Sequence, residues 1–240
     1  FIDNVNANQG TSVFISQCLF ANNFAYLDGG AAYILNVHAI TMIGNEFINN
    51  IARTGYGGAL ILKNNDDSQQ HQSKKQGTSV YIIKCLFSNN LASTTGGAID
   101  VVNNNLTFIR NCRFKKNKSK IQGAVTIKGV NYIKNSHNQF LFNPLPTHRF
   151  RYENFDPDVG ALYIEDAYVF LNSNNTYLNN QGSQFASIYI IRARLVETLN
   201  CKFIANNGPR GAALHSISVD IVLNINTIYL QNRKKSNKIS

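Results

Sequence analysis

The chain has 240 residues, an apolar fraction of 44%, 23 Lys and Arg against 13 Asp and Glu, and a formal net charge of +10. This length can bury a sizeable core, and the positive charge favours anionic partners. No apolar run reaches the roughly 18 residues of a membrane span, and no secretory signal peptide is visible at the start of the chain.

A short pattern recurs along the chain: an aromatic residue, an Asn three residues later, and then a Gly-Ala pair followed by an aliphatic residue. The stretch from Cys85 to Asn90, with Gly-Gly-Ala-Ile at 96–99, shows it most clearly. The aromatic positions are Phe20, Phe47, Phe87, Phe114, Phe140, Tyr177, Phe203 and Tyr229. Subtracting their numbers gives spacings of 26 or 27 residues, apart from two steps of 40 and 37. A fixed period of this length predicts a repeat architecture.

Two strands are predicted in each repeat. One follows the motif Ala: its first position is Ala32, Leu60, Ile99, Val125, Leu162, Ile188 and Ala213, and its third is Ile34, Leu62, Val101, Ile127, Ile164, Ile190 and, as the one break, His215. The residue between these positions varies, so the period of two indicates a strand with one buried face. The other strand carries the aromatic residue, with a Cys, Asn or Thr two positions earlier on the same buried face.

No single repeat can bury its apolar face alone, whereas stacked repeats can pair each strand with its equivalent one turn on. The sequence therefore predicts an all-β fold, a right-handed parallel β-helix of about eight turns with two loop insertions, as a single segment over residues 1–240. The eight Asn residues of the pattern should form an amide ladder at one corner. They are Asn23, Asn50, Asn90, Asn117, Asn143, Asn180, Asn206 and Asn232.

The two long spacings locate the insertions, at about residues 64–77 and 144–157. The first is charged and lacks hydrophobic residues, which is typical of a surface loop. Asp66, Asp67 and His71 in it could be metal ligands, but a solvated loop is the stronger interpretation. No metal site and no cofactor are predicted elsewhere.

The fourth repeat is basic at a corner, with Lys115, Lys116, Lys118 and Lys120, and the second insertion adds Arg149 and Arg151. Basic residues near aromatic ones can bind anionic glycans, although a solvated face is the alternative. Tyr163 and Tyr189 fall at outward positions of consecutive repeats, where a stacked pair could form a sugar platform. Strand propensity alone also explains them.

Three sequons begin at Asn105, Asn117 and Asn174. Asn117 belongs to the expected ladder, so Asn174 and Asn105 are the candidate glycosylation sites. The cysteines Cys18, Cys85, Cys112 and Cys201 all occupy the inward Cys/Asn/Thr column. Side chains in such a ladder point the same way, which suits a disulfide poorly, so free buried thiols are expected.

The combination of Phe-x-x-Asn with Gly-Gly-Ala-Ile resembles the repeat of the polymorphic outer-membrane protein adhesins, and the matching motifs run from about Phe20 to Asn232. The resemblance implies a pectin-lyase-like β-helix in a surface protein, and similar repeats occur in large surface proteins of protists. Because this fold hosts adhesins, lyases and scaffolds alike, the resemblance indicates architecture more strongly than function.

Polysaccharide lyases and hydrolases of this fold need clustered carboxylates. Here Asp100 is the lone acid of its outward column, and adjacent Glu165 and Asp166 should face opposite ways along a strand. The leading hypothesis is therefore a non-enzymatic, extracellular or cell-surface structural or adhesive segment of a longer protein. Its partners would be further β-helix or capping segments, or copies docked end to end. The alternatives are an acidic-glycan-binding module and, third, a polysaccharide lyase; no nucleic-acid partner is expected.

Overall fold

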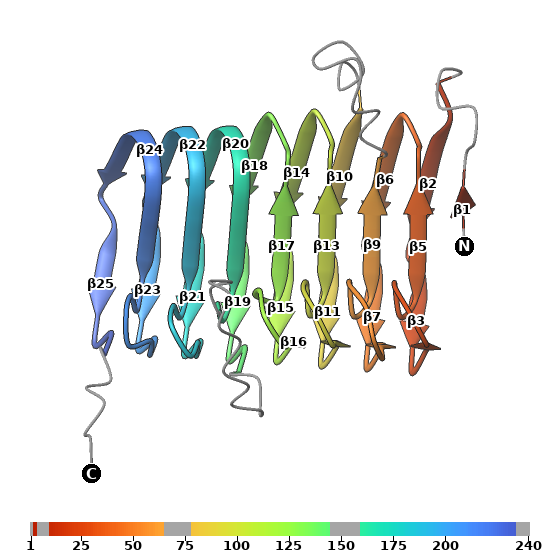
Figure 1. The fold of residues 1–240 in the computed structure, drawn as a ribbon, viewed down its shortest axis with the longest axis horizontal. Coiled ribbons are helices and arrows are strands. Elements are labelled where there is room, and N and C mark those ends of the chain that lie inside the picture. The colour runs from red at the N-terminus through yellow and green to blue at the C-terminus, as the bar shows by residue number, and fades with distance from the viewer. Residues whose placement is uncertain (1, 4–9, 65–77, 145–158, 234–240) are drawn as a thin grey trace.

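The computed structural model describes residues 2–3, 10–64, 78–144 and 159–233, and these form a parallel β-helix that contains no α-helix (Figure 1). Every strand pairing among them is parallel and in register. The eight strands of one wall mark about seven turns, so the all-β solenoid prediction is confirmed. Of the two expected insertions, 64–77 and 144–157, only the edges at Asn64 and Pro144 fall within the described residues.

Each turn passes through three walls. The first wall contains β2 (Ser12–Ser16), β6 (Ala39–Ile43), β10 (Ser79–Ile83), β14 (Leu106–Arg110) and β18 (Tyr132–Ser136). The second contains β3 (Leu19–Ala21), β7 (Glu46–Ile48), β11 (Leu86–Ser88), β15 (Arg113–Lys115), β19 (Gln139–Leu141), β21 (Thr176–Leu178), β23 (Lys202–Ile204) and β25 (Ile228–Leu230). The third contains β5 (Ala32–Leu35), β9 (Leu60–Lys63), β13 (Ile99–Val102) and β17 (Val125–Lys128), with β1 (Ile2–Asp3) paired to β5.

A separate short sheet lies between the second and third walls and contains β4 (Phe24–Ala25), β8 (Ile51–Ala52), β12 (Leu91–Ala92) and β16 (Lys118–Ser119). In the last three turns one long strand runs through both the third and the first wall. These strands are β20 (Leu162–Ser173), β22 (Ile188–Leu199) and β24 (Leu214–Ile225). They join the first and third walls into one sheet of 13 strands (Figure 1).

The chain turns from the third wall to the first at a residue with left-handed backbone. Asn103 (φ 57°), Gly129 (φ 63°), Asp166 (φ 55°) and Arg192 (φ 57°) hold this position in four successive turns. Asn, Asp and Gly tolerate this conformation better than other residues, whereas Arg192 adopts it without that advantage. The bend at Asp166 also changes the alternation of the strand around it.

The aromatic residues form one continuous stack inside the coil. Ring centroids of neighbours, from Phe20 through to Tyr229, lie 4.7 to 5.2 Å apart, and neighbouring planes differ by at most 12°. This separation matches the strand spacing, because each ring follows its own strand to the next turn. The aromatic column of the repeat is thus one internal stack.

The Asn ladder is also confirmed. In each turn the Asn side-chain oxygen accepts hydrogen bonds from the preceding turn. Asn90 Oδ1 accepts from the backbone N–H of Asn50 at 2.9 Å and from its Nδ2 at 3.0 Å. Asn90 Nδ2 in turn donates to the carbonyl of Phe47 at 2.9 Å, behind the aromatic stack. The hydrogen bond from the backbone N–H to Oδ1 recurs at every step from Asn23 to Asn232. The ladder therefore satisfies backbone groups at a corner where no sheet does.

The Cys/Asn/Thr column works in the same way beside it. Asn45 Oδ1 accepts from the N–H of Cys18 at 2.9 Å, and Asn45 Nδ2 donates to the carbonyl of Ile15. In a later turn Cys112 Sγ replaces the amide: it accepts from the N–H of Cys85 at 3.4 Å and donates to a carbonyl of the previous turn. All four cysteines are free, as expected. Cys18 is exposed rather than buried, which corrects that part of the prediction, because it lies in the first described turn of its wall.

Glycine is required before the third wall because the backbones of successive turns touch there. A methyl group on Gly58 would lie 2.1 Å from the carbonyl oxygen of Gly97. The residues that precede this glycine position fold back over the outer face of the third wall. Thr95, Gln122, Val159 and Phe185, from successive turns, form a line of parallel bridges there.

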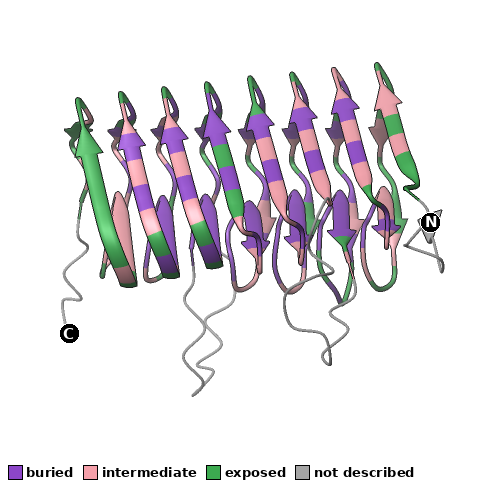
Figure 2. Cartoon of the chain, turned by 90° about the horizontal axis from the view of Figure 1, so that it is seen from above, coloured by how far each residue is buried: buried purple, intermediate pink, exposed green. Residues whose placement is uncertain are grey.

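The register of the last turn differs from the sequence alignment by one residue. Leu214 pairs with Ile188 and His215 with Tyr189, so His215 lies in the outward column and Ser216 takes the inward place. The His215 ring stacks on Tyr189, with centroids 5.6 Å apart and planes 10° apart. Figure 2 shows β24 mostly exposed at this end, while the equivalent faces of inner turns are buried.

Candidate ligand-binding surfaces

The basic corner lies where β15 meets β16. Lys115 ends β15, Lys116 follows with left-handed backbone (φ 55°), and Lys118 begins β16. Between them Asn117 is fully buried in the ladder, which forces its neighbours outward. Lys116 is exposed and Lys115, Lys118 and Lys120 are half-buried.

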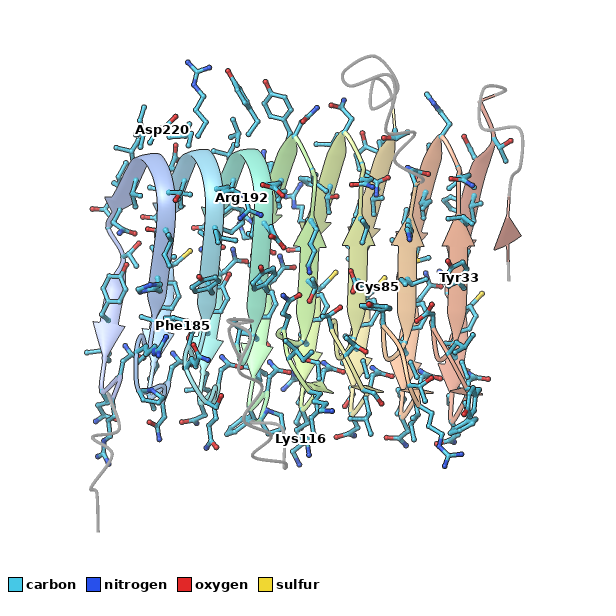
Figure 3. All side chains as sticks on the ribbon, viewed as in Figure 1. Tyr33, Cys85, Lys116, Phe185, Arg192 and Asp220 are labelled. Atoms are coloured by element: carbon cyan, nitrogen blue, oxygen red, sulfur yellow. The ribbon has the colours of Figure 1, made fainter. Side chains whose placement is uncertain are left out.

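Figure 3 places Lys116 at the lower corner of the coil, far from Asp220 at the upper bend. The four lysines are thus gathered at one corner, as a fixed feature of one turn. Arg149 and Arg151, the other expected members of this site, lie outside the described residues.

The expected sugar platform of Tyr163 and Tyr189 is wrong as an open surface. The rings do stack, with centroids 5.7 Å apart and planes 17° apart. However, they are only 3% and 5% exposed, because Val159 and Phe185 cover them in a small apolar cluster outside the third wall. Both tyrosines lie on the outward face of their strands, as the alternation predicts, but a strand pattern does not predict which segment covers that face.

Asp100 is buried beneath the same covering segment, at 2% exposure, although its column faces outward. Thr95 Oγ1 donates a hydrogen bond to Asp100 Oδ2, while Oδ1 has no partner among the described residues. Burial raises the pKa of this carboxyl to about 6. An acid enclosed in this way cannot reach a polysaccharide.

Glu165 and Asp166 do not face opposite ways as expected, because the left-handed bend at Asp166 turns its side chain back. Arg192 of the next turn binds both: its Nε donates to Asp166 Oδ1 at 2.6 Å and an Nη contacts Glu165 Oε1. These contacts raise the pKa of Arg192 further above its usual value. The two carboxylates are therefore neutralised as an ion-pair cluster. Within the described ranges, no group of three His, Cys, Asp or Glu could hold a metal ion.

The candidate glycosylation sites differ in accessibility. Asn174 is exposed, at a left-handed position (φ 54°) just before β21. Asn105 is half-buried, and its Oδ1 accepts a hydrogen bond from Asn131 Nδ2 at 3.0 Å. Asn117 is enclosed in the ladder, in agreement with its rejection as a site.

One surface was not identified from the sequence. The outer face of the first wall and the bend before it carry aromatic and cationic side chains that contact one another across turns, among them Tyr132, Lys134 and Tyr168. The sequence could have indicated this surface only through the alternation of these residues in strands of the first wall, which the repeat pattern does not predict.

The last described turn has an open edge. Ile221 is 49% exposed, Tyr229 is 45% and Leu230 is 51%, whereas their equivalents in inner turns are covered by the next strand. At the opposite end Phe14 and Leu19 are exposed to 66% and 65%. Both described ends therefore present unpaired strands and apolar side chains.

In the part of the chain that the structure describes, no helix is long and apolar enough to cross a membrane. A comparison with curated proteins and with solved structures finds no match. A comparison with protein families matches residues 84–101 to the Chlamydia polymorphic membrane protein repeat. These residues run from Lys84, directly after β10, through β11 and β12 into β13. The chain is thus a parallel β-helix that carries a repeat of the polymorphic membrane protein type, as its Phe-x-x-Asn and Gly-Gly-Ala-Ile motifs indicated.

Proposed function

We propose that this chain is a non-enzymatic structural or adhesive β-helix segment of an extracellular or cell-surface protein. The observation that carries the proposal is the unbroken Asn ladder from Asn23 to Asn232. Because stacked, hydrogen-bonded side chains fill the interior, the coil is built as a rigid rod. The match to a surface-protein repeat supports the location. The exposed Asn174 would then be available for glycan attachment in an organism that glycosylates such proteins.

The open ends support a role in a longer rod. A strand edge with exposed apolar side chains invites pairing with another strand, so further turns of the same protein, a cap or a second copy would cover it. Repeated end-to-end docking gives a filament unless the contact closes into a ring.

The test is the oligomeric state of the purified chain. We expect concentration-dependent association by light scattering and rods longer than one segment by electron microscopy. Ile228→Lys with Leu230→Lys should abolish it by placing charges on the open edge, whereas Lys202→Glu, on the outer face of β23 one turn inward, should not. A wild-type chain that stays monomeric and stable at high concentration would argue against end-to-end docking.

A second candidate function is binding of acidic glycans at the basic corner. Its support is the gathering of Lys115, Lys116, Lys118 and Lys120 around one buried Asn. Binding to a sulfated glycan should weaken steeply with salt, because exposed charges are screened. Replacing the four lysines by Gln should remove the part of the binding that depends on this corner, and unchanged binding would assign the cluster to solubility.

A polysaccharide lyase is the weakest of the three. Asp100 is enclosed, and Glu165 and Asp166 are bound by Arg192. We expect no unsaturated product from acidic polysaccharides, with or without calcium. Release of such a product would overturn the non-enzymatic assignment.

A further inference from the structure

A connected stripe of aromatic and cationic side chains, here called the aromatic stripe, runs from the bend between the third and first walls onto the outer face of the first wall. Its members are Arg194, Tyr168, Tyr132, Lys134, Phe108 and Tyr81, which lie on β22, β20, β18, β14 and β10. These strands are successive neighbours in one sheet, so the stripe crosses five turns of the coil. Its length is on the order of 20 Å at the strand spacing of a β-sheet.

At one end of the stripe an arginine packs over a tyrosine ring. The guanidinium of Arg194 lies 5.0 Å from the centroid of the Tyr168 ring and donates to its hydroxyl. Tyr168 meets Tyr132 of the preceding turn edge to face, with centroids 6.1 Å apart. Tyr168 and Tyr132 are 44% and 49% exposed, so both rings are accessible to a ligand.

The other end repeats this arrangement. Lys134 follows Tyr132 by two residues on β18 and therefore projects from the same face. Its Nζ lies 5.9 Å from the Phe108 centroid, and Phe108 lies 6.1 Å from Tyr81 of the turn before. One cation followed by two rings thus occurs twice along the stripe.

The cations of the stripe are available to an anion. Neither Lys134 nor Arg194 forms an ion pair with any described residue, unlike Arg192 and Lys128 on the neighbouring face. Acidic side chains come at its edge only: Glu197 lies in the strand row of Lys134 and Asp220 one turn beyond Arg194. Each cation is already positioned over an aromatic ring, which reduces the freedom it would lose on binding.

We propose that the aromatic stripe binds a linear anionic polysaccharide, sulfated or rich in uronic acid. Sugar rings would pack on Tyr132, Tyr168 and Phe108, and anionic groups would meet Lys134 and Arg194. This inference rests on the proposed surface role and supplies the ligand class for adhesion. The site is separate from the basic corner, which lies at the junction of the second wall and β16.

The ring geometry favours a glycan over single-stranded nucleic acid. Single-stranded nucleic acids bind by stacking consecutive bases on aromatic side chains. Parallel rings suit such a stacked run of bases best. Here the planes of Tyr132 and Tyr168 differ by 61° and those of Tyr81 and Phe108 by 58°. Such inclined rings offer separate apolar surfaces, which suit the separate faces of successive sugars.

The experiment is calorimetric binding of a sulfated octasaccharide to the full chain and to three variants, all checked for an unchanged melting temperature. Lys134→Gln with Arg194→Gln should weaken binding by about tenfold or more, and should lower the salt dependence by about two released counterions. Tyr132→Ala with Tyr168→Ala should weaken binding similarly while leaving the salt dependence unchanged. Lys63→Gln with Lys202→Gln, on the third and second walls, removes the same charge outside both candidate sites and should change binding by less than about twofold.

Equal weakening in the Lys63 and Lys202 control would overturn the proposal, as would unchanged binding in the tyrosine variant. Absence of wild-type binding, or tighter binding of oligothymidylate of similar length, would also overturn it. If the stripe variants lose only self-association, the face is a lateral interface between copies and the glycan assignment fails. End-to-end association depends on other residues, so its loss or retention tests the proposed structural role independently.

Discussion

The hydroxyl of Tyr177 donates a hydrogen bond to Oδ1 of Asn172 at 2.9 Å inside the coil, where both residues are fully buried. Asn135 of the preceding turn donates to the same hydroxyl at 3.0 Å. A tyrosine can therefore replace phenylalanine in the aromatic stack here because neighbouring amides satisfy its hydroxyl. Burial raises the pKa of Tyr177 well above its usual value, so the hydroxyl stays protonated.

Tyr177→Phe tests this network. The variant keeps the ring stack but leaves Asn135 with one acceptor fewer, so we expect a loss of about 1–2 kcal/mol in the free energy of unfolding, measured by urea denaturation. Tyr229→Phe is the matched control. Its hydroxyl donates to Asn224 at 3.2 Å in the open last turn, where water can substitute. Equal losses in the two variants would mean that burial of the network contributes nothing.

The Asn ladder should be most sensitive in its middle. Asn90→Ala removes the acceptor of two Asn50 donors and the donor to Phe47, all buried. We expect a loss of about 3 kcal/mol or more in unfolding free energy. Asn23→Ala, in the same column at the exposed end, removes only the hydrogen bond from Asn23 Nδ2 to Asn50 Oδ1 and should cost about 1 kcal/mol or less. Similar melting temperatures for the two variants would contradict the ladder's role.

Asp100 should make stability depend on pH. Its pKa is raised in the folded chain to about 6, from 3.8. The stability that the protonated carboxyl contributes to the fold is therefore fully present below pH 3.8 and is lost as pH rises through 6. Above that pH the buried charge costs on the order of 2–3 kcal/mol. Asp100→Asn should therefore raise the melting temperature at pH 7 and leave it nearly unchanged at pH 3.5. A variant that is less stable at pH 7 would show that the carboxylate is needed.

The four cysteines should separate into two classes on alkylation. Cys18 is exposed and should react in the folded chain, whereas Cys85, Cys112 and Cys201 are buried and should need denaturant. The hydrogen bond from Cys112 lowers the pKa of Cys85 to about 7, which favours its thiolate, so slow labelling of Cys85 would report burial and not low reactivity. We expect one label in the native protein and four after unfolding, by mass spectrometry. Rapid native labelling of Cys85 would contradict the inward column.

The interior of this protein was predictable from its repeats. Phe87 and Asn90 recur with a fixed offset in each turn, and any residue at a fixed offset in an in-register coil must stack on its equivalent. The same logic placed Cys85 and Cys112 in one inward column. Local periodicity was sufficient here because the partner of each residue is a copy of itself.

The binding surfaces could not be predicted from the repeats, because they depend on contacts that do not recur from turn to turn. Tyr163 has the outward phase of a strand residue, yet Val159 folds back over it and closes the platform. The left-handed backbone at Asp166 brings it to Arg192 beside Glu165. The alignment of His215 failed for a related reason, since its register follows from pairing with Tyr189 rather than from its own motif. Exposure depends on which segments cover a wall, and these segments do not repeat, so periodicity determines the coil while covering segments and bends determine what it can bind.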